Sequence, residues 1–341
     1  MPSPDFEFHI GATDPMESKL AHAGFLAALR DEQASAVAES LQDRDALREE
    51  IWKRYGPAIE ELYFLRDNVA EAANWAAQKI DESLEQTPGD QAFYQFHLVQ
   101  RGLLARSLLS LGETIAMIEA GHSAGALACL RTMYEVLIVS IVMAIYGHPD
   151  AEHPDLPERY LMHREAFYGL FAADYLGAGL GDPDDPLFDD DDLGRLAVMR
   201  SDLVTRFGKD FARGWGWAAP LFDGRPASMT GLVQRVAPQL AILYSMMSAP
   251  THAGSDGWHN LITEDGLGSR EFKAYPDSGS LGAPIELSTG FVLLTAETVV
   301  PRSIKFEDAP PDQTGEAFLT AIADSRRRVS EHLSSVPDDP P

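Results

Sequence analysis

The chain has 341 residues, of which 45% are hydrophobic and 23% charged, a balance typical of a globular protein that buries a sizeable core. The formal net charge of −26 repels phosphate backbones, so we expect no non-specific binding to nucleic acid, although buried arginines could still hold a small anion. The single cysteine, Cys129, excludes a disulfide framework or a thiolate zinc site within one chain.

The N-terminal quarter of the chain predicts an extended segment followed by a helical arm. Residues 1–15 contain three prolines and are expected to lie extended, with Asp14 as the N-cap of the first helix. Residues 16–86 show helical periodicity, which Gly56-Pro57 should kink or break. The amphipathic first half of this arm favours an interface with a second copy, giving a homodimer, or with a partner protein.

Residues 124–146 form a very apolar stretch that imitates a membrane span. The charges of Arg131 and Glu135 would each cost roughly 2.5–3.5 kcal/mol in the middle of a membrane. The charge-free remainder, residues 136–146, is too short to cross. We therefore expect a buried core helix and no membrane association. The N-terminal residues also lack the basic and apolar regions of a signal peptide, which indicates a cytoplasmic protein.

The rest of the chain predicts one main helical domain over residues 90–335, with a disordered tail over 336–341. Turn residues divide it into helices at about 91–120, 123–147, 158–176, a segment ending near 207, 228–248 with Ser228 as N-cap and a kink at Pro238, 286–300 and 311–334. Strand signals are confined to Phe6–Ile10 and Phe272–Tyr275, and residues 249–285 could include a short hairpin. The predicted fold is therefore all-α, an irregular multi-helix bundle of about eight to ten helices with an N-terminal helical arm.

Two charged residues interrupt the most apolar helix. Arg131 and Glu135 are four residues apart and therefore share one helical face. Charges buried at such positions must be paired, because an unpaired buried charge costs several kcal/mol. The pair is either an internal brace or a site in which Arg131 holds an anion and Glu135 orients a partner.

A later segment offers partners for this pair. Tyr244, Ser248 and His252 would share a face if their helix continued, but Pro250 is expected to end regular helix near Ser248. His252 would then lie in the turn beyond the helix. A histidine there could serve as an acid or base, or it could only close the helix by bonding a carbonyl.

These residues carry a family resemblance. The run from Ala124 to Leu137, with its Leu-Arg-x3-Glu pattern, resembles a helix of a bacterial helical family catalogued as a domain of unknown function (DUF5677-like). The downstream Tyr-x3-Ser-x3-His segment is similar at Tyr244, Ser248 and His252, and the aromatic segment Trp215–Trp217 lies between the two motifs. The resemblance covers roughly residues 95–305 and implies a helical fold with a polar cluster, but no particular reaction.

A second comparison is with the HEPN ribonucleases, whose Arg-x4–6-His motif places a cation beside a general base. Arg326 and His332 match this spacing, whereas Arg159 and His163 miss it by one residue. The matching pair lies near the C-terminus, among arginines on a helix face that we expect to be exposed. This spacing therefore gives only an alternative interpretation.

Two segments carry metal-binding residue types without the required spacing. Residues 148–155 hold two histidines and three acids, but they include two prolines and no histidine pair one helical turn apart, which favours a solvated loop. The aspartates between 182 and 192 lack the glycine that a calcium-binding loop needs for its turn. We expect no metal site and no cofactor.

Two functional hypotheses follow from the sequence. The first is a ligand- or partner-binding module whose buried Arg131, Glu135, Tyr244, Ser248 and His252 recognise a small anion or a protein. The second is an enzyme, a metal-independent nuclease or hydrolase-like effector of stress or phage defence, with His252 and Glu135 as candidate catalytic residues.

Overall fold

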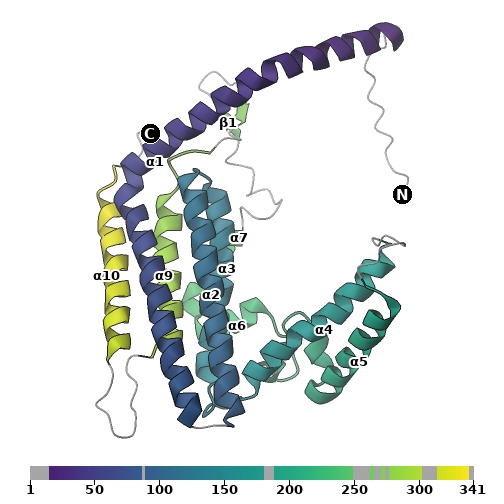
Figure 1. Ribbon diagram of the computed structural model, residues 1–341, viewed down its shortest axis with the longest axis vertical. Helices are drawn as coiled ribbons and strands as arrows, with labels where there is room; N and C mark the ends of the chain where they lie inside the picture. The colour runs from purple at the N-terminus through teal and green to yellow at the C-terminus, as the bar shows by residue number, and fades with distance from the viewer. Residues whose placement is uncertain are drawn as a thin grey trace. The chain divides into compact units, whose positions relative to one another are not determined.

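A computed structural model describes residues 15–86, 89–179, 188–248, 262–264, 270–272, 276–301 and 313–337 (Figure 1). Of residues 15–36, 86, 190 and the two strands it describes the backbone only. Within this part the chain is all-α apart from one short strand pair, which confirms the predicted fold class. The chain divides into two units, residues 1–50 and residues 51–341.

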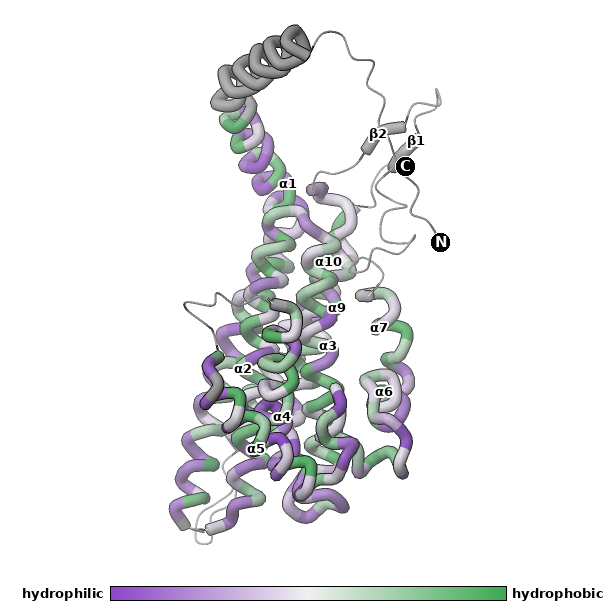
Figure 2. The backbone as a smooth tube through the Cα atoms, turned by 90° about the vertical axis from the view of Figure 1, so that its right-hand side faces the viewer, coloured by the Kyte–Doolittle hydropathy of each residue, from purple (hydrophilic) through white to green (hydrophobic). Residues whose placement is uncertain are grey.

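Helix α1 (Pro15–Gln86) belongs to both units. Its side chains from 37 to 50 are exposed apart from Leu47, which is partly covered. From Ile51 onward the helix buries an apolar stripe at helical spacing, which includes the fully buried Ile51, Ile59, Leu62, Leu65 and Val69. In the coloured part of α1 in Figure 2, hydrophilic and hydrophobic residues alternate along the helix. The predicted arm over 16–86 is therefore divided, because its second half is core of the larger unit.

The proline of α1 does not break the helix. Pro57 lies inside the continuous α1, so the predicted break is wrong, whereas the predicted kink stays a prediction. A proline costs one backbone hydrogen bond and a steric contact in the preceding turn. Tyr55, Ala58 and Ile59 are each at most 3% exposed, and this burial offsets the local cost.

Helices α2 (Gln91–Glu119) and α3 (Ser123–Tyr146) are antiparallel neighbours, as their short link predicts. Asp90 caps α2 by accepting a hydrogen bond from the backbone of Phe93 at 2.9 Å. The contacts between the two helices show this antiparallel order, because residues further along α2 contact residues earlier in α3. Gln100 meets Ser140. Thr114 meets Met133 further along α2.

A buried polar contact joins three helices of the bundle. The Gln100 amide donates to the Ser140 carbonyl at 3.2 Å and accepts from the Ser140 hydroxyl at 2.7 Å. The same hydroxyl lies 2.5 Å from that of Thr298 on α9 (Gly282–Val299). Gln100 and Ser140 are at most 1% exposed. Because buried polar groups need partners, this contact favours one register of α2, α3 and α9.

Helices α4 (Leu156–Gly177) and α5 (Asp190–Phe207) lie side by side at one side of the bundle (Figure 1). Asp189, one residue of the predicted acidic run, caps α5 by accepting from the Asp192 backbone at 2.7 Å. Two short 3₁₀ helices follow, η1 (Lys209–Ala212) and η2 (Gly216–Phe222), in an irregular segment that includes Trp215 and Trp217.

A buried arginine of α4 holds this irregular segment. Arg159 is 5% exposed, and its Nε donates to the Trp217 carbonyl at 2.9 Å. Its Nη2 lies 3.4 Å from the Phe207 carbonyl and 3.5 Å from that of Gly216. The rings of Phe207 and Phe211 lie 4.9 and 5.4 Å from the guanidinium carbon. Burial lowers the pKa of Arg159 below its ordinary value.

The next segment is broken by a proline. Ser228 caps α6 (Met229–Val236) by accepting from the Gly231 backbone at 3.1 Å, which confirms the predicted cap. The chain then leaves the α-helix at Ala237, passes through η3 (Pro238–Leu240) and continues as α7 (Ala241–Ser248). The break at Pro238 is stronger than the predicted kink, because proline cannot donate the hydrogen bond that would continue α6.

A short hairpin follows, as the sequence allowed. Strand β1 (Ile262–Glu264) pairs antiparallel with β2 (Arg270–Phe272), with Ile262 opposite Phe272. The predicted strand Phe272–Tyr275 thus shares only Phe272 with the observed one. The other predicted strand, Phe6–Ile10, and the predicted cap Asp14 lie outside the described residues.

Helices α9 and α10 (Thr314–Ser334) complete the larger unit beside α1 (Figure 1). Arg328 of α10 forms a bidentate ion pair with Glu61 of α1, with N···O distances of 2.6 and 3.0 Å. Ser330 donates to both carboxylate oxygens of Glu286, at 2.8 and 2.9 Å. These contacts join α10 to both neighbours.

Helix α3 is, within the described residues, long and apolar enough to span a membrane. More than half of its most apolar window is buried inside the protein. A core helix of a soluble protein has the same length and composition, so this feature alone is weak evidence for a membrane span.

Candidate functional site

The predicted Arg131–Glu135 pair lies at the edge of the core. Arg131 Nε lies 3.4 Å from Glu135 Oε1, and the two side chains are 25% and 33% exposed. The sequence predicted a buried pair, and the structure corrects this. The fully buried face of α3 includes Leu130 and Tyr134, each one position before a member of the pair. A step of one residue rotates the side chain by about 100°, and this rotation places both charges beside the core.

Tyr244 of α7 completes the polar cluster. Arg131 Nη2 donates to the Tyr244 hydroxyl at 2.9 Å, and the guanidinium carbon lies 5.1 Å from the centre of the Tyr244 ring. The guanidinium is thus held by oxygens from α3 and α7, although the two residues are 113 positions apart in sequence. The structure brings together Arg131, Glu135 and Tyr244 as the sequence analysis grouped them.

The remaining two residues of the predicted site are Ser248 and His252. The Ser248 hydroxyl donates to the Tyr244 carbonyl at 2.7 Å, one turn earlier on α7. This bond satisfies a carbonyl near the end of the helix. Helix α7 is described as far as Ser248. His252 lies outside the described residues.

Tyr134 supports the cluster from inside the core. Its hydroxyl donates to the Leu240 carbonyl at 3.1 Å, just before α7 begins. Its ring centre lies 5.7 Å from those of both Tyr244 and Phe291. Burial, with a smaller contribution from Tyr244, raises the pKa of Tyr134 to about 12. Tyr134 therefore positions α7 and stays neutral at physiological pH.

Sequence reasoning did not assign Tyr134 this role. The available signal was a tyrosine in the most apolar helix, because a buried tyrosine hydroxyl needs a hydrogen-bond partner. The partner itself could not be predicted, since it is a backbone carbonyl far along the chain.

The ribonuclease-like spacing on α10 does not form a compact site. Arg326 is exposed and His332 is partly buried. Six residues on a helix correspond to a rotation of about 600°, which places the two side chains about 120° apart. They therefore do not share one face of α10.

The ion pairs of the histidine- and acid-rich loop, among those described, join residues close in sequence. His148 Nδ1 lies 3.7 Å from Asp150, and His153 Nε2 lies 3.8 Å from Glu152. Across the described residues, no three His, Cys, Asp or Glu side chains are grouped as a metal ion would require. Asp182, like the rest of residues 180–187, lies outside the described residues.

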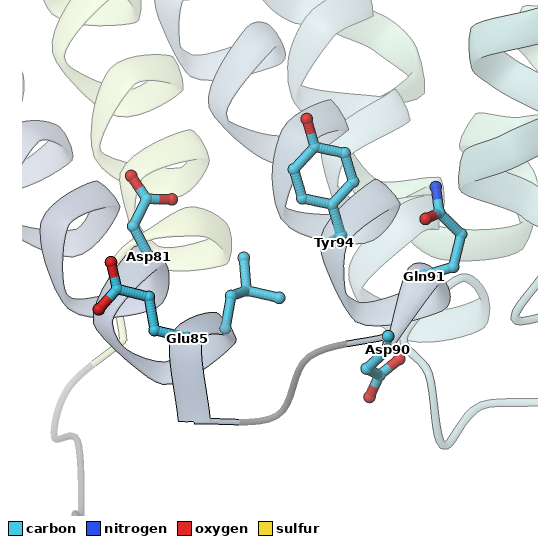
Figure 3. A pocket seen from close by; sticks show the side chains of 7 residues that line it. Asp81, Glu85, Asp90, Gln91 and Tyr94 are labelled. Carbon is cyan, nitrogen blue, oxygen red and sulfur yellow. The ribbon is translucent and has the colours of Figure 1, made fainter.

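A separate acidic pocket lies between the end of α1 and the start of α2 (Figure 3). It has a volume of about 410 Å³ and is lined by Asp81, Leu84, Glu85, Gly89, Asp90, Gln91 and Tyr94. In Figure 3, Tyr94 stands on the α2 side, opposite the two acids of α1. The pocket does not include the Arg131 cluster.

An adjoining cavity contains a partly buried histidine that the sequence analysis did not select. His97 lines this cavity of about 510 Å³, together with Arg101. Its ring centre lies 4.3 Å from that of Phe93 and 5.0 Å from that of Phe96. Burial, with smaller contributions from His148 and Arg101, lowers the pKa of His97 from 6.5 to about 4. His97 is therefore neutral at pH 7.

His97 should make the protein less stable in mild acid. The unfolded chain takes up the proton near pH 6.5 and the folded chain only near pH 4, so stability falls as pH falls between these values. The free energy of unfolding of the wild type should fall by about 1–3 kcal/mol between neutral pH and pH 4 because of His97, and His97→Gln should not show this fall. Urea unfolding of both proteins across this range measures the difference. The exposed His122→Gln is the control and should leave the wild-type profile unchanged; an equal change in both variants would contradict the prediction.

The fold and the cluster define an all-α protein with a polar cluster held between α3 and α7. A family model described as Family of unknown function (DUF5677) matches residues 97–269, which is more than half of the chain. The chain belongs to this family, as the resemblance noted in the sequence predicted. The match begins where the resemblance predicted but ends before residue 305. No curated protein and no solved structure matches the chain.

Proposed function

We propose that this protein is a ligand-binding module that recognises an anionic group through Arg131. The observation that carries this proposal is the guanidinium, which is oriented by Glu135 and Tyr244 from two helices while the side chain stays one quarter exposed. A guanidinium that is already oriented loses less conformational freedom when it binds a carboxylate or phosphate. The cluster also lies within the family segment, residues 97–269.

The length of the Arg131–Glu135 contact favours an anionic ligand that replaces Glu135 as a partner of the guanidinium. The Arg131–Glu135 distance of 3.4 Å is at the long end of hydrogen bonding, so this contact helps to orient the guanidinium but is weaker than a short ion pair. An incoming carboxylate or phosphate forms shorter, charge-assisted bonds with arginine. With a net charge of −26 around it, the arginine must supply local attraction by direct contact rather than by a long-range field.

The test is a binding panel with inorganic phosphate, succinate and adenosine monophosphate, measured by calorimetry and thermal shift. Arg131→Ala should abolish binding, and Tyr244→Phe should weaken it about ten- to a hundredfold, because a hydrogen bond to a charged group contributes about 1.5–3 kcal/mol. Both variants should stay folded, since the side chains lie at the edge of the core. Arg327→Ala, which removes an exposed arginine from α10, should bind as the wild type does.

Two outcomes would contradict the proposal. One is equal binding by the wild type and Arg131→Ala. The other is RNA cleavage by the purified protein that is lost in His252→Ala without loss of thermal stability. That second result would favour the nuclease alternative that the sequence left open.

A further inference from the structure

The second half of α4 carries exposed aromatic side chains in an uncharged stretch. Phe167 and Phe171 are 57% and 44% exposed, and residues 166–173 contain no charged side chain. Contiguous apolar exposure of this kind on a soluble protein marks a surface that another molecule covers. The stretch lies on the α4–α5 pair, away from the Arg131 cluster of α3.

The exposed residues form one stripe along α4. Arg164, Phe167, Phe171 and Asp174 are spaced by three, four and three residues, so they lie on the same face of the helix. All four are exposed. Gly169 lies on the opposite face, where an added Cβ would be 3.2 Å from the Leu196 carbonyl of α5. Helix α5 therefore packs behind the stripe and does not cover it.

The stripe has the symmetry that a pair of identical helices requires. Arg164 and Asp174 are equally distant from position 169, and so are Phe167 and Phe171. In an antiparallel pair with a two-fold axis at that position, each arginine lies opposite the aspartate of the other copy. Each Phe167 then lies opposite Phe171 of the other copy. A two-fold interface is self-complementary in this way.

We propose that two copies of this chain dimerise through the Arg164–Phe167–Phe171–Asp174 stripe of α4. The net charge of −26 opposes contact between copies over most of the surface, whereas the stripe has an uncharged centre and opposite charges at its ends. Two α4–α5 pairs then form a four-helix layer, which buries the aromatic rings that a single pair leaves exposed.

The decisive experiment is a charge exchange measured by sedimentation velocity on the full chain. The wild type should be a dimer. Arg164→Asp and Asp174→Arg should each raise the dissociation constant roughly tenfold or more, because every substitution places like charges together twice in a symmetric dimer. The double variant Arg164→Asp/Asp174→Arg should dimerise about as tightly as the wild type, since both ion pairs are restored in reverse.

Two further variants separate this surface from the N-terminal arm. Phe167→Asp should give a folded monomer by circular dichroism, because the ring is exposed in each copy. Val37→Asp, on the exposed face of α1, should remain dimeric. A monomeric wild type, a dimer that Val37→Asp alone dissociates, or a folded double variant that stays monomeric would each overturn the proposal.

Discussion

Replacing Arg159 with alanine is expected to lower the free energy of unfolding by about 2–4 kcal/mol. The substitution removes the donor that satisfies the Trp217 carbonyl at 2.9 Å and leaves the Phe207 and Gly216 carbonyls without their cationic neighbour. It also opens a cavity against the Phe207 and Phe211 rings, since the arginine is 5% exposed. Urea unfolding followed by circular dichroism measures this loss.

Two controls test whether geometry or charge is responsible. Arg159→Lys keeps the charge, but a single ammonium cannot replace a planar guanidinium that faces several carbonyls, so most of the loss should remain. Arg213→Ala removes an exposed arginine from the same region and should change stability by no more than about 0.5 kcal/mol. Full stability of Arg159→Lys would show that charge alone suffices.

Replacing Gly315 with alanine is expected to destabilise the protein by about 3 kcal/mol. Gly315 is buried in the first turn of α10, where an added Cβ would lie 1.8 Å from the Pro301 carbonyl oxygen and 2.9 Å from the Trp75 side chain. A backbone carbonyl cannot move as the end of a flexible side chain can. The start of α10 must therefore shift, which strains its packing on α1 and α9.

Gly112→Ala is the matched control in an open position. Apart from its chain neighbours and the local helix backbone, no atom lies within 4 Å of the Cβ that alanine would add inside α2, so this variant should gain about 0.5–1 kcal/mol from helix propensity. If close packing decides the effect, thermal and urea unfolding should show a loss of stability for Gly315→Ala and a gain for Gly112→Ala. Equal stability of Gly315→Ala and the wild type would show that α10 adapts at its first turn.

The sequence predicted the helices well because their end signals are local. Asp90 and Ser228 act as caps through bonds to residues three positions later, and such spacing is visible in the sequence. Pro57 and Pro238 show the limit of this reasoning. Both residues have the same chemistry, yet one lies within α1, among buried neighbours, and the other follows the end of α6. Proline chemistry alone does not decide between these outcomes, which depend on how the rest of the fold packs around each turn.

The candidate site was predicted as a set of residues but not as a geometry. Four-residue spacing determines that Arg131 and Glu135 share a face, and the motif pointed to Tyr244. The sequence could not tell that this face lies at the edge of the core, with one quarter of the arginine exposed. Nor could it assign Tyr134 to the Leu240 carbonyl. These features depend on where α7 packs against α3.

The sequence by itself determined the all-α class, most helix boundaries, the family and the polar residues of the candidate cluster. The tertiary structure alone decided that the second half of α1 is core, that Arg159 holds the η1–η2 segment and that the α4 stripe stays uncovered. The reason is physical: periodicity and capping act over a few residues and are encoded locally. Exposure, carbonyl partners and pKa shifts arise when helices distant in sequence pack together and exclude water.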